Sequence, residues 1–406
     1  MSSNFITGLD IGTSSLKVVV AENKGGHPIL RLVFKEPSAG MRKGTIVDLA
    51  EASQAINRAL AKVKKLSKAA VKNVYINIGT PQAKSQVSRG IVAVSRADTE
   101  IYRDDVDRAV KASQAVNLSP NRTIIHNVTR EFVVDGVGDI PDPQGLSGSR
   151  LEVQSLVIDA FSPHVKSLVK AVELAGGEMA GLVFSPLVAS RAALSRSQKD
   201  LGVALVDVGF GTTGLAIYEE SKLLSAVKFP VGASNISNDL AVGLKMPVPA
   251  AENLKLNYGY ALARDVGHKE SIDLKKFYPE AKGTVSRRFV AEIIESRLAE
   301  ILDFVNNELK LLGDRGKLPG GVVLVGGGAK MPGLSDLVKQ ELKLPSQVGL
   351  PVGDEWKSED ANSDEFLEDP EFINALGLVL WGTDSDGWRR EGNFGLKNVI
   401  KLFLPS

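Results

Sequence analysis

The stretch LGVALVDVGFGTTGLAIY, residues 201–218, decides the fold of this chain. An apolar run leads into Asp207, a turn rich in Gly and Thr follows at residues 209–213, and a second apolar run leaves the turn. This pattern predicts a β-hairpin whose backbone N–H groups can converge on an anion. An aspartate at the end of the incoming strand is suited to holding the water shell of a metal ion. Turns of this composition also serve only to reverse a chain, so the stretch alone leaves both interpretations open.

The same pattern occurs near the start of the chain. Residues 5–9 are an apolar run that ends in Asp10, and residues 16–21 form the returning run with Lys17 at its beginning. Small and hydroxyl residues make the turn between them: Gly12, Thr13, Ser14 and Ser15. Two copies of strand, aspartate, turn and strand predict a duplicated fold that closes on one phosphate chain from both sides.

A third glycine cluster follows the apolar run at residues 322–325. It consists of Gly326, Gly327 and Gly328 and is followed by a helical pattern that ends at Leu342. Because glycine has no side chain, three in a row allow the backbone to approach a flat ring closely. The order of the three elements makes a chance occurrence improbable.

These elements together resemble the actin-like ATPase superfamily, which actin, sugar kinases and heat-shock chaperone ATPases share. Over nearly the whole chain, the sequence is also similar in finer detail to the FtsA family of bacterial cell-division proteins. The stretches that carry it are GLDIGT at residues 8–13, SGSRLEV at 147–153, PVGASNISNDLA at 230–241 and DPEF at 369–372. The second turn of the family usually reads Gly-Gly-Gly-Thr-Thr-Asp, whereas this chain has Phe210 and Gly214 in place of a Gly and the closing Asp. The resemblance therefore implies ATP binding with at most slow hydrolysis.

The resemblance implies an α/β fold with two duplicated, RNase H-like lobes. Residues 1–81 and 163–199 are expected to form the first lobe and residues 200–382 the second. Residues 82–162 are expected as an inserted subdomain with strands at 87–94, 123–134 and 151–160, a helix at 104–116 and a surface loop at 136–148. Residues 49–66 and 371–380 read as helices, and residues 265–281 as irregular.

The resemblance also implies ATP and Mg²⁺ as ligands and assigns their contacts. The phosphate contacts are Asp10, Gly12, Thr13, Ser14, Ser15, Lys17, Gly209, Gly211, Thr212 and Thr213, with Gly326, Gly327 and Gly328 at the adenine. Asp10 and Asp207 are expected to hold Mg²⁺ through water, and Asp207 or Thr212 to orient the attacking water. Four residues are expected to contact the ribose and the base of ATP: Glu252 and Lys255, which share a helix face, and Arg288 and Glu292. Glu252 and Lys255 can equally form an ordinary surface ion pair.

The last residues read as a linker at 383–393, rich in glycine, and a helix at 394–406. One face carries apolar residues at helical spacing, and two lysines lie beside it: Leu396, Val399, Ile400 and Phe403, with Lys397 and Lys401. Such a helix can lie on a membrane or pack against its own protein. In the FtsA family it targets the membrane, which implies a peripheral protein at the cytoplasmic face of the septum.

Composition sets wider bounds. The 406 residues include 49 Lys and Arg and 48 Asp and Glu, and this balance gives no argument for a nucleic acid partner. The absence of cysteine fits a reducing cytoplasm, and four scattered histidines do not predict a zinc site. No secretory signal and no apolar stretch of about 20 residues are predicted.

The implied function is an ATP-binding scaffold that polymerises, tethers FtsZ filaments to the membrane and recruits later division proteins. Two alternatives share the core: a PilM-like pilus-assembly adaptor and a sugar or metabolite kinase. A kinase needs an aspartate base beside the γ-phosphate, and no carboxylate in the sequence stands out for that role.

Overall fold

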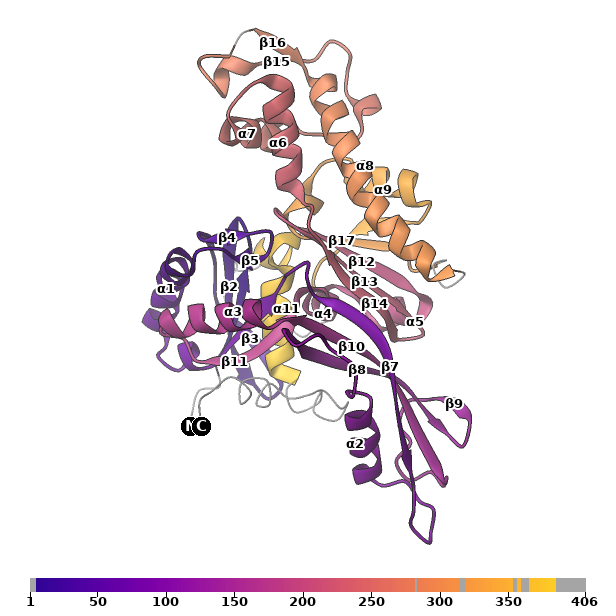
Figure 1. Ribbon diagram of the computed structural model, residues 1–406. Coiled ribbons are helices and arrows are strands. Elements are labelled where there is room, and N and C mark those ends of the chain that lie inside the picture. Colours follow the sequence, from indigo (N-terminus) through magenta and orange to yellow (C-terminus); the bar gives the residue numbers. More distant parts are fainter. Residues whose placement is uncertain (1–4, 282, 314–317, 353–355, 359–364, 385–406) are drawn as a thin grey trace.

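The computed structural model of this chain describes residues 5–281, 283–313, 318–352, 356–358 and 365–384. Two lobes, each built on its own β-sheet, lie side by side, and a smaller α/β insert extends from them (Figure 1). A helical layer stands on the second sheet, at the top of the same view. The predicted α/β fold with two duplicated lobes and an insert is confirmed.

The first sheet has six strands with mainly apolar residues on both faces. In spatial order they are β11 (Met179–Phe184), β6 (Val74–Ile78), β1 (Phe5–Ile11), β2 (Ser15–Lys24), β3 (His27–Pro37) and β19 (Lys357–Ser358). The strands β3, β2 and β1 pair antiparallel, and β1, β6 and β11 pair parallel. Strands that are buried on both faces need helices on both sides.

Helices cover both faces of this sheet. On one face lie α1 (Leu49–Leu66) and α3 (Ser162–Leu174), which pack together. The predicted bounds of α1 are confirmed, and the helix begins where the Asp48 side chain accepts the backbone N–H of Glu51 at 2.9 Å. On the other face, α11 (Ile373–Thr383) packs against β1 and against α4 (Ser185–Ala193).

The second sheet repeats the topology of the first. Its strands, in order, are β14 (Lys222–Phe229), β13 (Thr213–Glu219), β12 (Val203–Val208), β17 (Val322–Val325) and β18 (Ser346–Val348). The first three pair antiparallel and the last three parallel, as β3, β2, β1, β6 and β11 do in the first sheet. The duplication predicted from the two aspartate-bearing turns is therefore present in the order and direction of the strands.

The helical layer of the second lobe shares one apolar core with the second sheet. Its helices are α6 (Ala233–Leu244), α7 (Val248–Tyr258), α8 (Arg287–Leu311) and α9 (Leu334–Leu342), while α5 (Arg196–Leu201) joins the lobes. The prediction of an irregular segment at residues 265–281 is wrong in part. That segment contains β15 (Ser271–Asp273), which pairs with β16 (Thr284–Ser286). Three-residue strands lack the length to show an alternating pattern in sequence.

The remaining short elements connect these layers. They are β4 (Met41–Arg42), β5 (Thr45–Ile46), η1 (Ala70–Lys72), η2 (Ala263–Asp265), η3 (Leu274–Lys276), η5 (Gly327–Lys330) and η6 (Pro370–Phe372). Both η5 and η6 matter for function, because they bring the glycine cluster and the residues before α11 together.

The insert is a four-stranded sheet with one helix. Its strands, in order, are β7 (Lys84–Ala93), β10 (Arg150–Phe161), β8 (Arg122–Val134) and β9 (Val137–Ile140), and α2 (Arg103–Ala112) packs against them. The predicted helix at 104–116 ends four residues early, and the predicted loop at 136–148 begins with β9. Asp135 and Gly136 both have positive φ, 47° and 88°, as a two-residue hairpin turn requires. The Asp-Gly pair is the sequence signal that the loop prediction overlooked.

Contacts join the insert to the second lobe as well as to the first. The Arg130 guanidinium on β8 donates from Nε to the backbone carbonyl of Leu223 on β14 at 2.7 Å, and it also donates to that of Leu224. Lys222 on β14 reaches Glu131 at 3.2 Å. The insert strands therefore run against the edge strand of the second sheet (Figure 1).

The chain end is described up to residue 384. Thr383, the first residue of the predicted linker, still belongs to α11, and Asp384 pairs with Arg191 at 2.5 Å. The rest of the predicted linker and the predicted helix at 394–406 lie outside the described residues. Within the described part of the chain, no helix is both long enough and apolar enough to cross a membrane.

Candidate nucleotide-binding site

A cavity of about 470 Å³ lies between the two hairpins. Most of the predicted ligand contacts line it: Asp10, Gly12, Thr13, Ser14, Ser15, Lys17, Asp207, Gly209, Gly211, Thr212, Glu252, Lys255, Gly326, Gly327 and Gly328. The two turns touch, because a Cβ at Gly211 would lie 2.9 Å from the Thr13 hydroxyl oxygen. Residues more than 190 positions apart in sequence therefore meet at one site.

The first turn presents a carboxylate and a lysine from adjacent strands. Asp10 on β1 and Lys17 on β2 are direct cross-strand partners, and the Lys17 ammonium lies 3.6 Å from the Asp10 carboxylate. Asn77, at the end of β6, donates from Nδ2 to Asp10 Oδ1 at 2.6 Å and accepts the Ile11 backbone N–H at 2.7 Å. Sequence analysis missed Asn77, although a buried amide in the apolar run VYINI is a recognisable signal.

Burial disfavours the ionised form of Asp10. Burial raises the pKa of Asp10, the Lys17 charge opposes that rise, and the nearby Asp207 carboxylate adds to it. Lys228 and the Asn77 hydrogen bond act in the same direction as Lys17. Because a cation would stabilise the ionised form of Asp10, this carboxylate is suited to a site that receives one.

The second turn has the same backbone plan. Gly209 N–H donates to the Thr212 carbonyl at 3.0 Å, and the Thr213 hydroxyl donates to the Val231 carbonyl at 2.9 Å. Thr213 therefore supports the turn from behind and does not line the cavity. Gly326 has φ of 84°, and a Cβ there would lie 2.4 Å from Asp207 Oδ1, so only glycine fits against this carboxylate.

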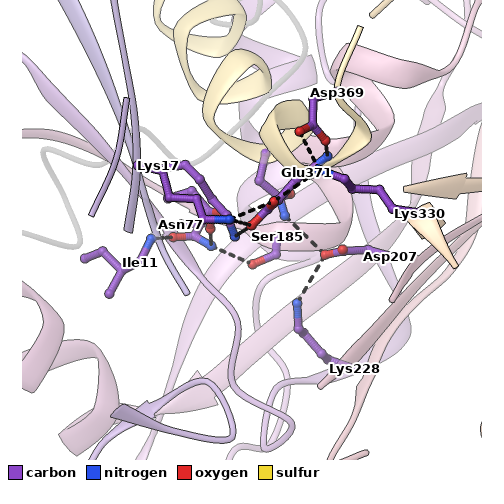
Figure 2. A network of polar contacts seen from close by, with 12 residues as sticks. Ile11, Lys17, Asn77, Ser185, Asp207, Lys228, Lys330, Asp369 and Glu371 are labelled. Atoms are coloured by element: carbon purple, nitrogen blue, oxygen red, sulfur yellow. Dashed lines mark hydrogen bonds and ion pairs between the residues drawn. The ribbon is translucent and has the colours of Figure 1, made fainter. Parts of the chain in front are cut away.

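Two residues that the sequence analysis missed hold Asp207. Asn374 on α11 donates from Nδ2 to Asp207 Oδ2 at 3.1 Å, and the Lys228 ammonium on β14 lies 3.5 Å from the same oxygen. The side chains of Lys228 and Asp207 are 6% and 4% exposed, so this ion pair is buried (Figure 2). A lysine in the apolar strand KLLSAVKF was the available signal.

Glu371, on η6, gathers three lysines at the rim of the cavity. Its carboxylate lies 2.9 Å from the Lys35 ammonium. It also lies 3.7 Å from the ammonium groups of Lys17 and Lys330 (Figure 2). Burial alone would raise the pKa of Glu371, but the charges of the three lysines lower it. The stretch DPEF, noted for its resemblance, thus contributes a carboxylate that joins the first-lobe strands to the glycine cluster.

Glu252 and Lys255 form an ion pair on α7 in which the lysine is buried and the glutamate is partly exposed, so the alternative of an ordinary surface ion pair is wrong for Lys255. The Lys255 side chain is 4% exposed and lies 2.7 Å from the Glu252 carboxylate. Its ammonium also donates to the Ser237 hydroxyl at 2.9 Å and to the Ala233 carbonyl at 3.1 Å. Burial lowers the pKa of Lys255, and Glu252 opposes this shift.

Arg288 and Glu292 do not line the cavity. They pair with each other at 3.6 Å along α8, and the Arg288 guanidinium also contacts the His268 ring at 2.8 Å. Their assignment to the ribose and base stays a prediction.

The residues present fit a magnesium-bound polyphosphate. Two carboxylates and two lysines line one cavity, with Asp10, Lys17 and Asp207 beside the two turns and Lys228 on β14, and the turns add backbone N–H groups. In the described part of the chain, no three His, Cys, Asp or Glu side chains cluster as a complete metal site. Two aspartates suffice for a cation that is held through its water shell, since Mg²⁺ keeps several waters and completes its shell with phosphate oxygens.

Comparison with known sequences relates this chain to one protein family. The family model described as "Cell division protein FtsA" matches residues 204–377, and the model "SHS2 domain inserted in FTSA" matches residues 81–159. The cell division protein FtsA of Bacillus subtilis is 33% identical over 380 residues, which cover 93% of this chain and 83% of that protein. The chain belongs to the FtsA family. The FtsA of Borreliella burgdorferi is 32% identical, with 94% of this chain and 91% of that protein covered.

Solved structures extend the likeness of this FtsA-family protein to the actin-like fold. The PilM–PilN type IV pilus biogenesis complex contains a chain with a TM-score of 0.67 and 19% identity, covering 93% of this chain and 98% of that one. MreB5 of Spiroplasma citri bound to ADP has a TM-score of 0.53 and 13% identity, with 98% and 97% covered. The MamK double helical filament has the same score and identity, with 92% and 97% covered. At these identities the likeness establishes the fold alone, and the sequence relatives establish a cell-division protein.

Proposed function

We propose that this FtsA-family protein binds ATP with Mg²⁺ between its two lobes and serves as a membrane-bound scaffold of cell division. The observation that carries the proposal is the meeting of two aspartate-bearing turns, one from each copy of a duplicated fold, across one cavity. MreB5, which shares the fold, is described as bound to ADP, and this supports a nucleotide in the equivalent cavity.

Each group in the cavity has a role in this proposal. The backbone N–H groups of the two turns, the hydroxyls of Thr13 and Thr212, and Lys17 bind the phosphates. Asp10 and Asp207 hold Mg²⁺ through its water shell, and the ion neutralises phosphate charge when bound. The backbone at Gly327 and Gly328 leaves room for the adenine. The ribose is bound from α7 by Glu252 and Lys255.

Hydrolysis is expected to be slow. Asp207 or Thr212 orients the attacking water, but Gly214 has no carboxylate where the family usually has the closing Asp of the turn. Phosphoryl transfer depends on positioning the nucleophile. The missing carboxylate at Gly214 should therefore slow hydrolysis more than it weakens ATP binding.

Calorimetry with Mg-ATP tests the site. Asp10→Ala, Asp207→Ala and Thr212→Ala are each expected to weaken binding by roughly tenfold or more, the effect of losing a contact to a charged group. Asp336→Ala is the matched control, because that carboxylate is exposed on α9 and pairs only with Lys339 in the described structure. Unchanged affinity in all three site variants would remove the assignment.

The membrane role rests on the sequence of residues 394–406. Each large apolar side chain of that helix contributes roughly 1.5–3 kcal/mol at most when it enters lipid. Isolated helices shorter than about 12–15 residues are marginal in water, so ordering a segment of this length as a helix offsets much of this gain. A single copy should therefore bind a membrane weakly, and several copies joined in a polymer should bind it stably.

Vesicle co-sedimentation tests this role. Removing residues 394–406, or the change Phe403→Glu, is expected to abolish sedimentation with vesicles that contain anionic lipid while ATP binding remains. Equal sedimentation of the truncated and full-length protein would place the membrane contact elsewhere.

Polymerisation and FtsZ binding complete the proposal. The MamK filament has the same fold, which supports a filament here, and the insert is the candidate contact between neighbouring copies or with later division proteins. A variant in which a short linker replaces residues 82–162 should bind ATP but fail to assemble on vesicles.

FtsZ should co-sediment with vesicles only when the full-length protein is present. The two alternatives, a pilus-assembly adaptor and a metabolite kinase, share the fold, but the sequence relatives are cell-division proteins.

A further inference from the structure

The two hairpins of the cavity differ in where their lysine comes from. In the first lobe, Asp10 pairs directly with Lys17 on the neighbouring strand. In the second lobe, the direct partner of Asp207 is Gly214, and the direct partner of Gly214 on the next strand is Lys228. Residues opposite one another in a sheet share a face, so Asp207, Gly214 and Lys228 form one row.

Gly214 stands between Asp207 and Lys228 in this row and contributes no side chain there. Strands two places apart lie about 9–10 Å from each other, so the long lysine side chain reaches the aspartate past this position. The Lys228 ammonium lies 3.5 Å from Asp207 Oδ2. A Cβ at Gly214 would lie 3.7 Å from that oxygen, so the carboxylate of an aspartate there would compete for the same space or for the same lysine.

Lys228 keeps unused hydrogen-bonding capacity toward the cavity. An ammonium group has three N–H donors, and within the described residues Asp207 is the one acceptor found for Lys228. Lys228 lines the cavity, and its Nζ would lie 3.5 Å from a Cβ at Gly79, a residue of the first lobe. The buried ammonium therefore lies where the two lobes meet, beside the Asp207 carboxylate, and its charge also acts on Asp10.

We propose that Lys228 is a second phosphate-binding lysine, which reaches the terminal phosphates of a bound nucleoside triphosphate over Gly214. The inference rests on the proposed ATP binding and goes beyond it, because it names a phosphate contact outside the two turns and the glycine cluster. A fixed positive charge from each lobe lowers the demand for Mg²⁺. This chain should therefore retain more of its ATP affinity without a divalent ion than a chain with one such lysine.

A structural role for Lys228, limited to neutralising Asp207, predicts a different result. A merely structural pair affects folding and leaves the dependence of ATP affinity on Mg²⁺ unchanged. A phosphate-binding lysine matters most when no metal ion is present, since it is then a larger share of the positive charge around the phosphates.

The test is calorimetry of ATP binding in Mg²⁺ and in EDTA. Lys228→Met should weaken ATP binding in EDTA by roughly 10- to 100-fold, the cost of one charge-assisted hydrogen bond, and by less in Mg²⁺. Gly214→Asp should act in the same direction, because the new carboxylate pairs with Lys228. Lys339→Met, which removes an equal charge from the exposed face of α9, should have no effect.

Each outcome is decisive. Equal affinities of Lys228→Met and the unmodified protein in both buffers would overturn the inference and leave ATP binding intact. Failure of the unmodified protein to bind ATP in either buffer would overturn the proposed function, and the inference with it. If Lys228→Met does not fold, Lys228→Gln, whose amide can still donate to Asp207 without a charge, takes its place with the same expected change in Mg²⁺ dependence.

Discussion

The first and second hairpins share a strand order, a turn length and an aspartate, yet the aspartates and the nearby lysines have different partners in the two hairpins. Lys17 has two carboxylate neighbours, Asp10 and Glu371, whereas Lys228 has Asp207 alone within the described residues. Asp10 is hydrogen-bonded by Asn77 of the first lobe, and Asp207 by Asn374 of α11. Duplication has therefore preserved the backbone plan of the site, while the side chains around each aspartate have diverged.

The largest expected difference between the hairpins is the stability of two matched variants without ligand. Asp207→Asn should lower the free energy of unfolding by about 3–5 kcal/mol, because the buried Lys228 loses its carboxylate. Asp10→Asn should raise it at neutral pH. The pKa of Asp10 is raised in the folded state, so its ionisation costs stability as pH rises through that pKa, and an amide avoids the cost. Chemical denaturation at pH 7 measures both, and changes of the same sign would contradict the comparison.

Acid should lower the free energy of unfolding through a buried histidine between the insert and the first lobe. His126, on β8, is buried and accepts the Phe184 N–H at 2.9 Å, and burial lowers its pKa to about 4. The unfolded chain binds this proton near pH 6.5, so stability is lost as pH falls from about 6.5 toward 4, by on the order of 3 kcal/mol in total. His126→Gln keeps a hydrogen-bond acceptor but does not titrate, so its free energy of unfolding should change less with pH over this range. A profile equally steep in the variant would assign the acid effect to other groups.

Two glycines of the hairpins should respond differently to alanine. A Cβ at Gly8 on β1 would lie 2.3 Å from the Ala375 carbonyl oxygen of α11, so Gly8→Ala should cost about 1–3 kcal/mol of stability. At Gly214 the nearest atoms would lie 3.5 Å away, an ordinary contact, so Gly214→Ala should change stability by less than about 1 kcal/mol. Thermal unfolding of the pair checks this, and a similar loss in both would mean that the second sheet is packed as tightly as the first.

The smallest effect is expected at Arg288 and Glu292, which lie outside the cavity lining. Their ion pair is partly exposed on α8, so Arg288→Ala should change stability by no more than about 0.5 kcal/mol. If the predicted contact with the nucleotide base exists, the same variant should weaken ATP binding in calorimetry. An unchanged affinity would restrict the site to the residues that line the cavity between the hairpins.

The sequence by itself determined the features that depend on neighbouring residues. The aspartate-bearing turns, the helix at Leu49–Leu66 and the glycine cluster are each encoded by a continuous run, since strand alternation, capping and turn chemistry act over a few positions. The duplication was readable because the same local pattern occurs twice. The Asp135–Gly136 hairpin was equally readable from its dipeptide and was overlooked.

The tertiary structure alone decided which distant side chains complete the site. Asn77, Lys228, Glu371 and Asn374 lie on four elements scattered along the chain. The sequence marks Asn77 and Lys228 as polar residues in apolar strands, but it does not show which distant carboxylate each one contacts. Their function follows from strand order: β14 stands two strands from Asp207, and α11 crosses from the glycine cluster to the first sheet. No local pattern reports such proximity, because burial and charge pairing depend on which elements pack together and not on which residues are adjacent in the chain.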